Sequence, residues 1–278
     1  MRIPRALAAE WRREPEWLDD LPRLAAECAA AWELDLEEPY DTPHSLVVPA
    51  GEAVLKLNAP SHFEADNEAD ALACWDGQGA VRLLARDDGR RALLLERCVP
   101  GTTLHGSGAD ETAVVLGLLG RLPHNAPRDH PFRLLTDEAG RWAEELRERY
   151  ERGGRPFERS LLAAAIAVFR SVDRGASRLV NQDLHAGNVL RAEREPWLVI
   201  DPKPLVGERE VDGVGPLRNA GLSGDAGVVG RCLDALADLG MDRERLRGWG
   251  LAHALAWGFA HGRWSAQSIE AARTISRA

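Results

Sequence analysis

Lysine is scarce in this sequence. Only two of its 35 basic residues are lysines, Lys56 and Lys203, and all the others are arginines. This bias suggests a GC-rich coding background that converts surface lysine to arginine. The planar guanidinium of arginine cannot replace the compact ammonium of a flexible lysine side chain in every role. A lysine that persists is therefore a candidate for a chemical role. For Lys203, survival by chance at an exposed position is an equally good explanation.

The sequence also lacks the features of several protein classes. Its four cysteines are widely spaced, with no Cys-x-x-Cys pair, so neither a zinc site nor a disulfide framework is expected. No apolar run approaches the roughly 20 residues that span a membrane, and the apolar stretch near the N-terminus is too short for a signal-peptide core. The net charge of −9 argues against nucleic-acid binding. We therefore expect a cytoplasmic, monomeric globular protein that binds neither nucleic acid nor membrane.

Two short apolar runs in the second half of the chain each deliver polar side chains to one place. The first run is followed by a loop that contains Asp183 and Asn188, and the second ends at Asp201. The polar, proline-ended segment between them favours a hairpin that brings Asp201 back beside Asn188. In kinases, Asp-x-x-x-x-Asn supplies a group that orients or deprotonates a hydroxyl and then a metal ligand, and a later aspartate holds the second metal position. The spacing predicts a Mg²⁺ and phosphate site, and a polar loop shaped only by turn geometry is the alternative.

A second set of candidate residues lies in the first half of the chain. Lys56 ends the strand-like run Ala-Val-Leu-Lys, which resembles the kinase motif Val-Ala-Ile-Lys, whose lysine holds the α- and β-phosphates. The next segment, residues 63–75, is predicted to be a helix. A kinase needs a glutamate there to pair with the strand lysine. Glu68 is our candidate, Glu64 is the alternative one turn earlier, and a solvated helix face is the competing explanation for Glu68.

A hinge is expected after the last strand of this region. Two apolar runs flank Asp-Asp-Gly, a hairpin signal, and the second run is followed by Pro100 and Gly101. In a kinase, the backbone of such a hinge binds adenine, so the position matters more than the side chains. Glu96 and Cys98 therefore mark the predicted nucleotide-binding hinge.

The order of the predicted elements indicates an α+β, two-lobed protein-kinase-like fold. A helix over residues 17–33 and an antiparallel sheet belong to a small N-terminal lobe, residues 1–99. A mainly helical C-terminal lobe, residues 100–278, holds the catalytic hairpin. Asp110, Thr136 and Asp242 are predicted to cap helices there. No Gly-x-x-x-x-Gly-Lys motif is present, which excludes a Walker loop.

At these residues the sequence resembles the aminoglycoside phosphotransferase family, and in particular its streptomycin 6-kinase and hydroxyurea phosphotransferase branch. The resemblance covers nearly the whole chain. The segments that carry it are Ala-Val-Leu-Lys at 53–56, Glu-Ala-Asp-Ala-Leu at 68–72, Trp-Asp-Gly-Gln-Gly-Ala-Val-Arg-Leu-Leu at 75–84, Leu-Leu-Glu-Arg-Cys-Val-Pro-Gly at 94–101, Asp-Leu-His-Ala-Gly-Asn-Val-Leu at 183–190, Ile-Asp-Pro-Lys-Pro at 200–204 and Val-Gly-Glu-Arg-Glu at 206–210.

The resemblance implies ATP-dependent phosphorylation of a hydroxyl group on a small molecule. It makes Asp183 the catalytic base, Asn188 and Asp201 the Mg²⁺ ligands, and Lys56 with Glu68 the pair that holds the ATP phosphates. A streptomycin-type aminoglycoside is the first candidate acceptor. A kinase for hydroxyurea or another small metabolite is the alternative, and a catalytically silent, nucleotide-binding pseudokinase is the alternative of another class.

Two departures from the family pattern support the pseudokinase alternative. Asn181 and Gln182 stand where the family usually has His-Gly before the catalytic aspartate, and the loop at 40–47 that should cover the nucleotide has no glycine-rich pattern. Asparagine supplies both a donor and an acceptor, so we expect it to support the loop and activity to survive. The intact set of lysine, glutamate, two aspartates and asparagine also argues for an active enzyme.

A polycationic acceptor needs carboxylates around its reacting hydroxyl, both to bind it and to exclude neutral sugars. The candidates follow the catalytic hairpin, and they are Glu208, Glu210, Asp212 and Asp225. For any one of them, a solvated acid on an acidic protein is at least as good an explanation. His185 is expected to pack the loop or the substrate rather than bind metal, because no second His or Cys lies nearby.

Overall fold

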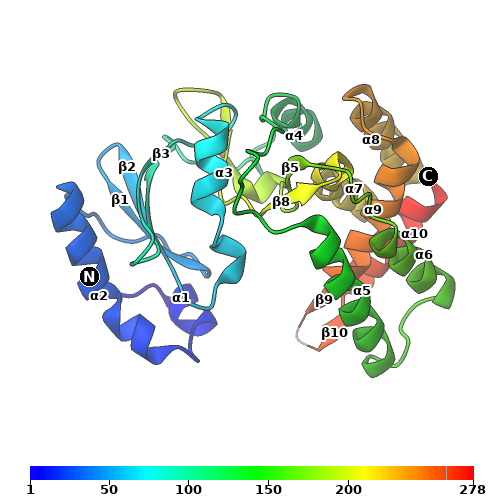
Figure 1. Cartoon of the computed structure of the whole chain (residues 1–278), viewed down its shortest axis with the longest axis horizontal. Helices are drawn as coiled ribbons and strands as arrows, with labels where there is room; N and C mark the ends of the chain where they lie inside the picture. The colour runs from blue at the N-terminus through cyan, green and yellow to red at the C-terminus, as the bar shows by residue number, and fades with distance from the viewer. Residues whose placement is uncertain (261) are drawn as a thin grey trace. The chain divides into compact units, whose positions relative to one another are not determined.

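The computed structural model describes residues 1–260 and 262–278, and these fall into two compact units (Figure 1). The first unit comprises Met1–Thr103 and Leu190–Asp201, and the second comprises Leu104–Val189 and Pro202–Ala278. The chain therefore leaves the first unit and returns to it for one short segment. The expected lobe boundary at residues 99 and 100 stays a prediction. No helix in the described ranges is long and apolar enough to cross a membrane.

The first unit is built on a four-stranded antiparallel sheet with the strand order β1-β2-β4-β3. Gly51, at φ +61°, forms the tight turn between β1 and β2, a conformation that glycine adopts without strain. The described elements of the unit's first segment are α1 (Arg5–Glu10), α2 (Pro15–Trp32), β1 (Ser45–Ala50), β2 (Ala53–Asn58), η1 (Phe63–Ala65), α3 (Glu68–Trp75), β3 (Leu83–Asp87) and β4 (Ala92–Glu96).

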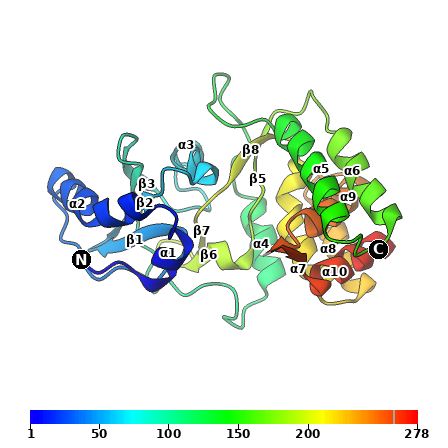
Figure 2. The ribbon, with the colours of Figure 1, turned by 90° about the horizontal axis from the view of Figure 1, so that it is seen from below.

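The core of this unit lies between the sheet and α2, which runs beside β1 and β2 in both views (Figures 1 and 2). One face of α2 is buried through Trp17, Leu21 and Ala25, which recur at helical spacing. Leu55 and Leu57 of β2 are fully buried in the same cluster. Because side chains alternate along a strand, the residue between these two leucines points to the opposite face of the sheet.

The returning segment, Leu190–Asp201, is fixed in the first unit by hydrogen bonds. β6 (Val189–Arg191) and β7 (Trp197–Val199) form a two-stranded sheet, which is the hairpin predicted from the sequence. Val199 exchanges backbone hydrogen bonds with the segment that precedes β3. Arg194, in the turn, donates to Glu96 at 2.7 and 2.8 Å and to two backbone carbonyls at 2.8 Å.

The second unit is mainly helical, with β5 paired antiparallel to β8 and α9 packed among α6, α7 and α10 (Figure 2). α9 is buried along most of its length. The described elements are α4 (Glu111–Leu119), α5 (Leu135–Arg152), α6 (Arg159–Arg170), β5 (Arg178–Asn181), η2 (Ala186–Asn188), β8 (Pro204–Gly207), η3 (Arg209–Gly213), α7 (Val214–Leu222), α8 (Ala226–Asp238), α9 (Arg243–Ala256), β9 (Phe259–Ala260), β10 (Arg263–Trp264) and α10 (Ala266–Arg277).

Two of the three predicted helix caps are confirmed. Asp110 and Asp242 each accept a hydrogen bond from a backbone N–H in the first turn, at 3.0 and 2.7 Å. The prediction that Thr136 caps a helix was wrong, because α5 begins one residue earlier, at Leu135, without a side-chain cap. Leu135 is fully buried, and its side chain occupies the space where Gly207 has no Cβ. Tertiary packing, rather than a cap, therefore sets the start of α5.

Helix α7 was not predicted, because its sequence contains two glycines and a proline. The packing of Gly215 explains why a glycine stands inside this helix. A Cβ at this position would lie 1.9 Å from the carbonyl oxygen of Leu184. Glycine thus allows α7 to pack directly against the backbone of the loop that carries Asp183.

Candidate active site

In the first unit, three of the predicted site residues meet around one ammonium group. Lys56 projects from β2 to the face opposite α2 and is 6% exposed. Its Nζ donates to both carboxylate oxygens of Glu68, at 2.7 and 2.6 Å, and to Oδ1 of Asp201 at 2.6 Å. The structure therefore pairs Lys56 with Glu68. Their role in phosphate binding stays a prediction.

The electrostatics of this cluster are those of a site rather than of a core. Burial alone would lower the pKa of Lys56, but the charges of Asp201 and Glu68 raise it overall, so the ammonium stays protonated. Burial raises the pKa of Glu68, and the adjacent ammonium opposes that rise. Buried ion pairs contribute little net stability compared with apolar packing. A buried lysine held by two carboxylates is better explained by a function that needs its charge.

Asp201 adds backbone strain to this cluster. It follows β7 with φ at +53°, in the left-handed region that few residues other than glycine adopt. Such strain costs on the order of 1–3 kcal/mol and collects at functional sites. Its side chain remains one-third exposed while it accepts from Lys56. The backbone conformation thus holds a partly accessible carboxylate at the end of the strand.

In the second unit, Asp183 lies at the centre of the remaining predicted residues. Lys203 places its Nζ 3.1 Å from Oδ2 of Asp183. Asn188 donates through Nδ2 to the Asp183 carbonyl at 3.1 Å and to its Oδ2 at 3.3 Å. His185 has its Nε2 3.7 Å from Oδ1 and accepts a hydrogen bond from the Gly187 N–H through Nδ1. A carboxylate is thus held between an ammonium, an amide and an imidazole.

Asn181, which with Gln182 departs from the family pattern, supports this loop through hydrogen bonds. Its side chain is buried, and its Oδ1 accepts from the N–H groups of Asp183 at 3.2 Å and Lys203 at 3.0 Å. Its own N–H donates to the buried carboxylate of Asp212 at 2.6 Å. Asparagine therefore ties together the two segments that carry Asp183 and Lys203, as expected of a loop-supporting residue.

Glu96 and Cys98 lie at the end of β4, where the hinge was predicted. Burial acts to raise the pKa of Glu96, but hydrogen bonds from Arg194 and the Arg82 N–H hold it below its usual range. Burial raises the pKa of the Cys98 thiol to about 11, which makes it an unreactive thiol. The side chains of both residues serve packing and pairing, and adenine binding by the backbone stays a prediction.

The predicted acceptor-binding acids have partners within the protein. Glu208 is buried and accepts from the Arg245 guanidinium at 2.6 and 2.9 Å, from Trp249 Nε1 at 2.7 Å and from the Asp173 N–H at 2.5 Å. The bonds from Arg245 and Trp249 join α9 to the residue that directly follows β8. The geometry therefore favours a structural role for Glu208 over substrate binding.

The other three acids in that set each accept from a backbone N–H. Asp212 is buried beneath β5, Glu210 accepts from the Asp242 N–H at 3.0 Å, and Asp225 caps α8 at 2.7 Å. Burial raises the pKa of Asp212 to about 7, against the hydrogen bond from Asn181. The sequence expectation rested on position after the hairpin alone, and acids that fix local structure occupy the same positions.

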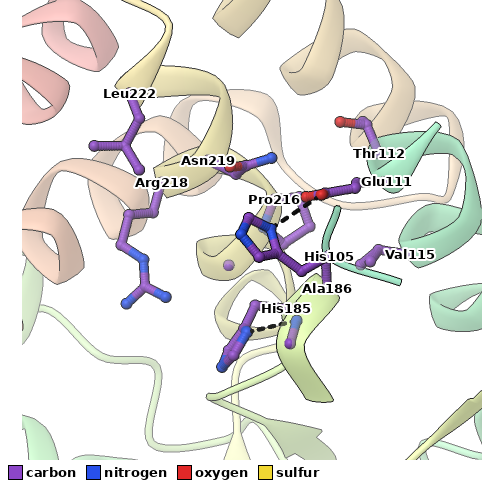
Figure 3. A pocket seen from close by; sticks show the side chains of 12 residues that line it. His105, Glu111, Thr112, Val115, His185, Ala186, Pro216, Arg218, Asn219 and Leu222 are labelled. Atoms are coloured by element: carbon purple, nitrogen blue, oxygen red, sulfur yellow. Dashed lines mark hydrogen bonds and ion pairs between the residues drawn. The ribbon is translucent and has the colours of Figure 1, made fainter. Parts of the chain in front are cut away.

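A cavity of about 250 Å³ lies beside the Asp183 loop, between α4 and α7 (Figure 3). Apart from His185, which was expected from the sequence to pack the loop or the substrate, its polar lining was missed by sequence reasoning. The residues that contribute it are His105, Glu111, Thr112, His185, Arg218 and Asn219. Glu111 reads in the sequence as an ordinary acid in the first turn of a helix, and only the fold brings it near His185.

Comparison with known proteins relates this arrangement to small-molecule kinases. Residues 33–267 match the family model described as aminoglycoside/hydroxyurea antibiotic resistance kinase. The chain is 38% identical to the streptomycin 6-kinase of Streptomyces griseus over 276 residues, covering 92% of this chain and 89% of that protein. It is 38% identical to the hydroxyurea phosphotransferase of Kitasatospora aureofaciens over 253 residues, covering 86% and 73%.

The solved structures it resembles include the choline kinase LicA from Streptococcus pneumoniae. The TM-score is 0.62 at 12% identity, covering 93% of this chain and 99% of that one. A similarity at this level of identity establishes the fold. The α+β, protein-kinase-like fold expected from the sequence is confirmed.

Proposed function

Because the chain belongs to the aminoglycoside/hydroxyurea antibiotic resistance kinase family, we propose that it transfers the γ-phosphate of ATP to a hydroxyl group of a streptomycin-type aminoglycoside. The enzyme is a small-molecule kinase, and its relatives are named for phosphorylating streptomycin or hydroxyurea. The proposal includes a cytoplasmic location, where ATP is available, and a monomeric state.

The observation that supports the chemistry best is the environment of Asp183. Its carboxylate is an acceptor placed between Lys203 and Asn188 on a loop fixed by buried hydrogen bonds. In the proposed reaction, Asp183 orients the acceptor hydroxyl and takes its proton as the oxygen bonds to the γ-phosphorus. The bond from that phosphorus to the β,γ-bridging oxygen breaks, and ADP leaves with the electron pair.

Lys56 would bind the ATP phosphates, and Glu68 would keep its ammonium in place on β2. In the pair seen here, Lys56 also contacts Asp201, so nucleotide phosphates would compete with that carboxylate for the ammonium. Glu96 and Cys98 would mark the backbone that binds adenine. Each of these assignments predicts a loss of nucleotide affinity when the contact is removed.

Asn188 and Asp201 would hold Mg²⁺, and their chemistry fits this ion. Both offer oxygen ligands, which Mg²⁺ prefers, and Asn188 uses its Nδ2 to contact Asp183, which leaves Oδ1 for a cation. Within the described ranges, no three His, Cys, Asp or Glu side chains gather to complete a metal site, so phosphate oxygens would supply further ligands. When bound, Mg²⁺ neutralises the charge of the transferring phosphate.

The test is an ADP-release assay with Mg-ATP, comparing streptomycin, other aminoglycosides and hydroxyurea as acceptors. The wild type should release ADP with streptomycin, and Asp183→Asn should lower kcat by roughly 10²- to 10⁴-fold, the usual contribution of a general base. ATP affinity, measured by calorimetry, should change little in this variant. An Asp183→Asn enzyme with the wild-type kcat would remove the assigned base, and turnover with hydroxyurea alone would keep the chemistry and replace the acceptor.

A further inference from the structure

The cavity between α4 and α7, which we call the α4–α7 cavity, offers a binding site for the acceptor. We propose that it holds a cationic, hydroxyl-bearing ring of the acceptor and that Glu111 binds the amino or guanidinium group of that ring. This inference rests on the proposed function, since it names the acceptor class for the same site. Its volume of about 250 Å³ is below that of typical drug-sized pockets, so it suits one ring rather than a whole aminoglycoside.

His185 connects the cavity to the assigned base. It lines the cavity, and its Nε2 lies 3.7 Å from Oδ1 of Asp183. Its Nδ1 accepts from the Gly187 N–H at 3.0 Å, which leaves the proton of a neutral ring on Nε2, facing Asp183. A ligand in the cavity that contacts His185 therefore reaches the neighbourhood of Asp183 without any rearrangement of the loop.

Glu111 is held in a fixed position with one oxygen open to a ligand. Its Oε1 lies 3.1 Å from Nδ1 of His105 and accepts from the Gly106 N–H at 3.2 Å (Figure 3). In the part of the chain that the structure describes, no hydrogen bond or ion pair involves Oε2 of Glu111. The side chain is 24% exposed, so a cation placed there would be partly desolvated. A pre-positioned carboxylate of this kind loses little entropy when it binds.

Arg218 gives the cavity a second, opposite charge. Figure 3 shows its guanidinium on a different side from Glu111, with the His105 ring between them in that view. Among the residues described, it makes no ion pair, so its charge is available to a ligand and repels a cation from that end. The cavity therefore orients a bound ring, with the cationic group toward Glu111 and hydroxyl oxygens toward Arg218.

The remaining lining suits a polyhydroxylated ring. Thr112 and Asn219 offer a hydroxyl and a carboxamide for hydrogen bonds, whereas Val115, Pro216 and Leu222 supply apolar contact for the ring faces. Streptomycin has guanidinium groups on a hydroxylated ring and matches this pattern. Hydroxyurea is neutral and too small to reach both charged ends, so it gains nothing from Glu111.

The experiment compares wild type with Glu111→Gln, which removes the charge and keeps the shape. The Kd of streptomycin, measured by calorimetry without nucleotide, and its KM should both rise about tenfold or more, the usual effect of losing a charge-assisted hydrogen bond. The kcat for streptomycin and the KM for hydroxyurea, where it is turned over, should stay within about twofold. The streptomycin Kd should also rise less steeply with salt in the variant, because one cation contact is gone.

Glu148→Gln is the matched control. It removes the same charge from an exposed position on α5, where the one interaction of the carboxylate among the described residues is a 3.6 Å pair with Arg152. It should leave every constant unchanged. An unchanged streptomycin Kd in a folded Glu111→Gln protein would overturn the inference and leave the proposed kinase activity intact. A wild type that binds streptomycin in a Glu111-dependent manner without turnover would keep the inference and overturn the proposed function.

Discussion

The two lysines of this arginine-rich chain each contact an aspartate of the candidate site. Lys56 donates to Asp201 in the first unit, and Lys203 pairs with Asp183 in the second. Both side chains are mostly buried, at 8% and 23% exposure. An ammonium at each position can move between a carboxylate and a phosphate oxygen, which a planar guanidinium does less readily. These contacts favour a chemical role for both lysines over survival by chance.

Lys203→Met should lower kcat by roughly 10²-fold, the cost of removing one charged group aimed at the reacting atoms. The streptomycin Kd should change little, because Lys203 does not line the α4–α7 cavity. Steady-state kinetics and calorimetry measure the two effects separately. Lys203→Arg keeps the charge and should recover only part of the rate. A methionine variant with wild-type kcat would show that Lys203 has no part in the reaction.

At the residue scale, the sequence predicted those groups whose role follows from short-range spacing. Asp183 and Asn188 lie in the loop just before the β6–β7 hairpin, Asp201 follows it, and Lys56 is marked by its strand motif, so local pattern was enough to select these residues. Their roles stay predictions. Glu111 and Arg218 were missed because they come from two helices that only the tertiary fold brings to one cavity. Charge alone could not distinguish them from the many solvated acids and arginines of the chain.

At the element scale, the position of the loop that carries Asp183 depends on buried hydrogen-bond acceptors, namely the side chains of Asn181 and Asp212. Asp212, in η3, accepts from the Asn181 N–H, and Asn181 in turn accepts from Asp183 and Lys203. These hydrogen bonds connect η3, β5 and the start of β8. A change in the charge of Asp212 therefore acts on the position of the base through two hydrogen-bond steps.

The free energy of unfolding should depend on pH through Asp212. Burial raises its pKa to about 7 in the folded protein, whereas the unfolded value is about 3.9. Between these values the folded state binds more protons, so the stabilising contribution is complete below about pH 4 and is lost as pH rises through about 7. Relative to Asp212→Asn, the wild type should lose up to about 4 kcal/mol across this window.

Urea unfolding of both proteins at a series of pH values measures this difference. The comparison with Asp212→Asn removes the contributions of all other titrating groups, which the two proteins share. Asparagine can still accept the hydrogen bond from Asn181 through its side-chain oxygen, so the variant should fold. Parallel stability curves for the two proteins would show that folding does not raise the pKa of Asp212.

Local rules predicted elements well where local hydrogen bonds decide the structure. The caps at Asp110 and Asp242 are examples, since a side-chain oxygen one turn from a backbone N–H is visible in the sequence. The start of α5 at Leu135 and the whole of α7 were not predicted. Leu135 packs against Gly207, and Gly215 lets α7 pack against the backbone of Leu184, so in both cases tertiary packing overrides the local preference.

At the scale of the whole molecule, the chain builds its first unit from two separate segments. Leu190–Asp201 supplies Arg194, which donates to Glu96 and to the carbonyls of Gly77 and Ala80, and Asp201, which accepts from Lys56. The sequence predicted the hairpin but did not predict that this segment belongs to the first unit. Pairing of residues about a hundred or more positions apart leaves no periodic signal.

This interleaving predicts that residues 1–103 alone do not form a stable fold. Without the returning segment, the half-buried Glu96 loses its guanidinium partner, and the buried Lys56 loses one of its two carboxylates. An uncompensated buried charge typically costs about 3–5 kcal/mol, which is a large part of the stability of a small unit. The isolated fragment should therefore show weak, non-cooperative thermal unfolding by circular dichroism.

Joining residues 190–201 to this fragment through a flexible glycine-serine linker should restore cooperative unfolding and slow amide exchange in β2 and β4. The matched control is the same linked protein with Arg194→Met, which keeps the strand pairing of β7 and removes the hydrogen bonds to Glu96. It should unfold at a temperature between those of the two other proteins. A fragment of residues 1–103 as stable as the linked protein would show that the returning segment docks on a sheet already complete.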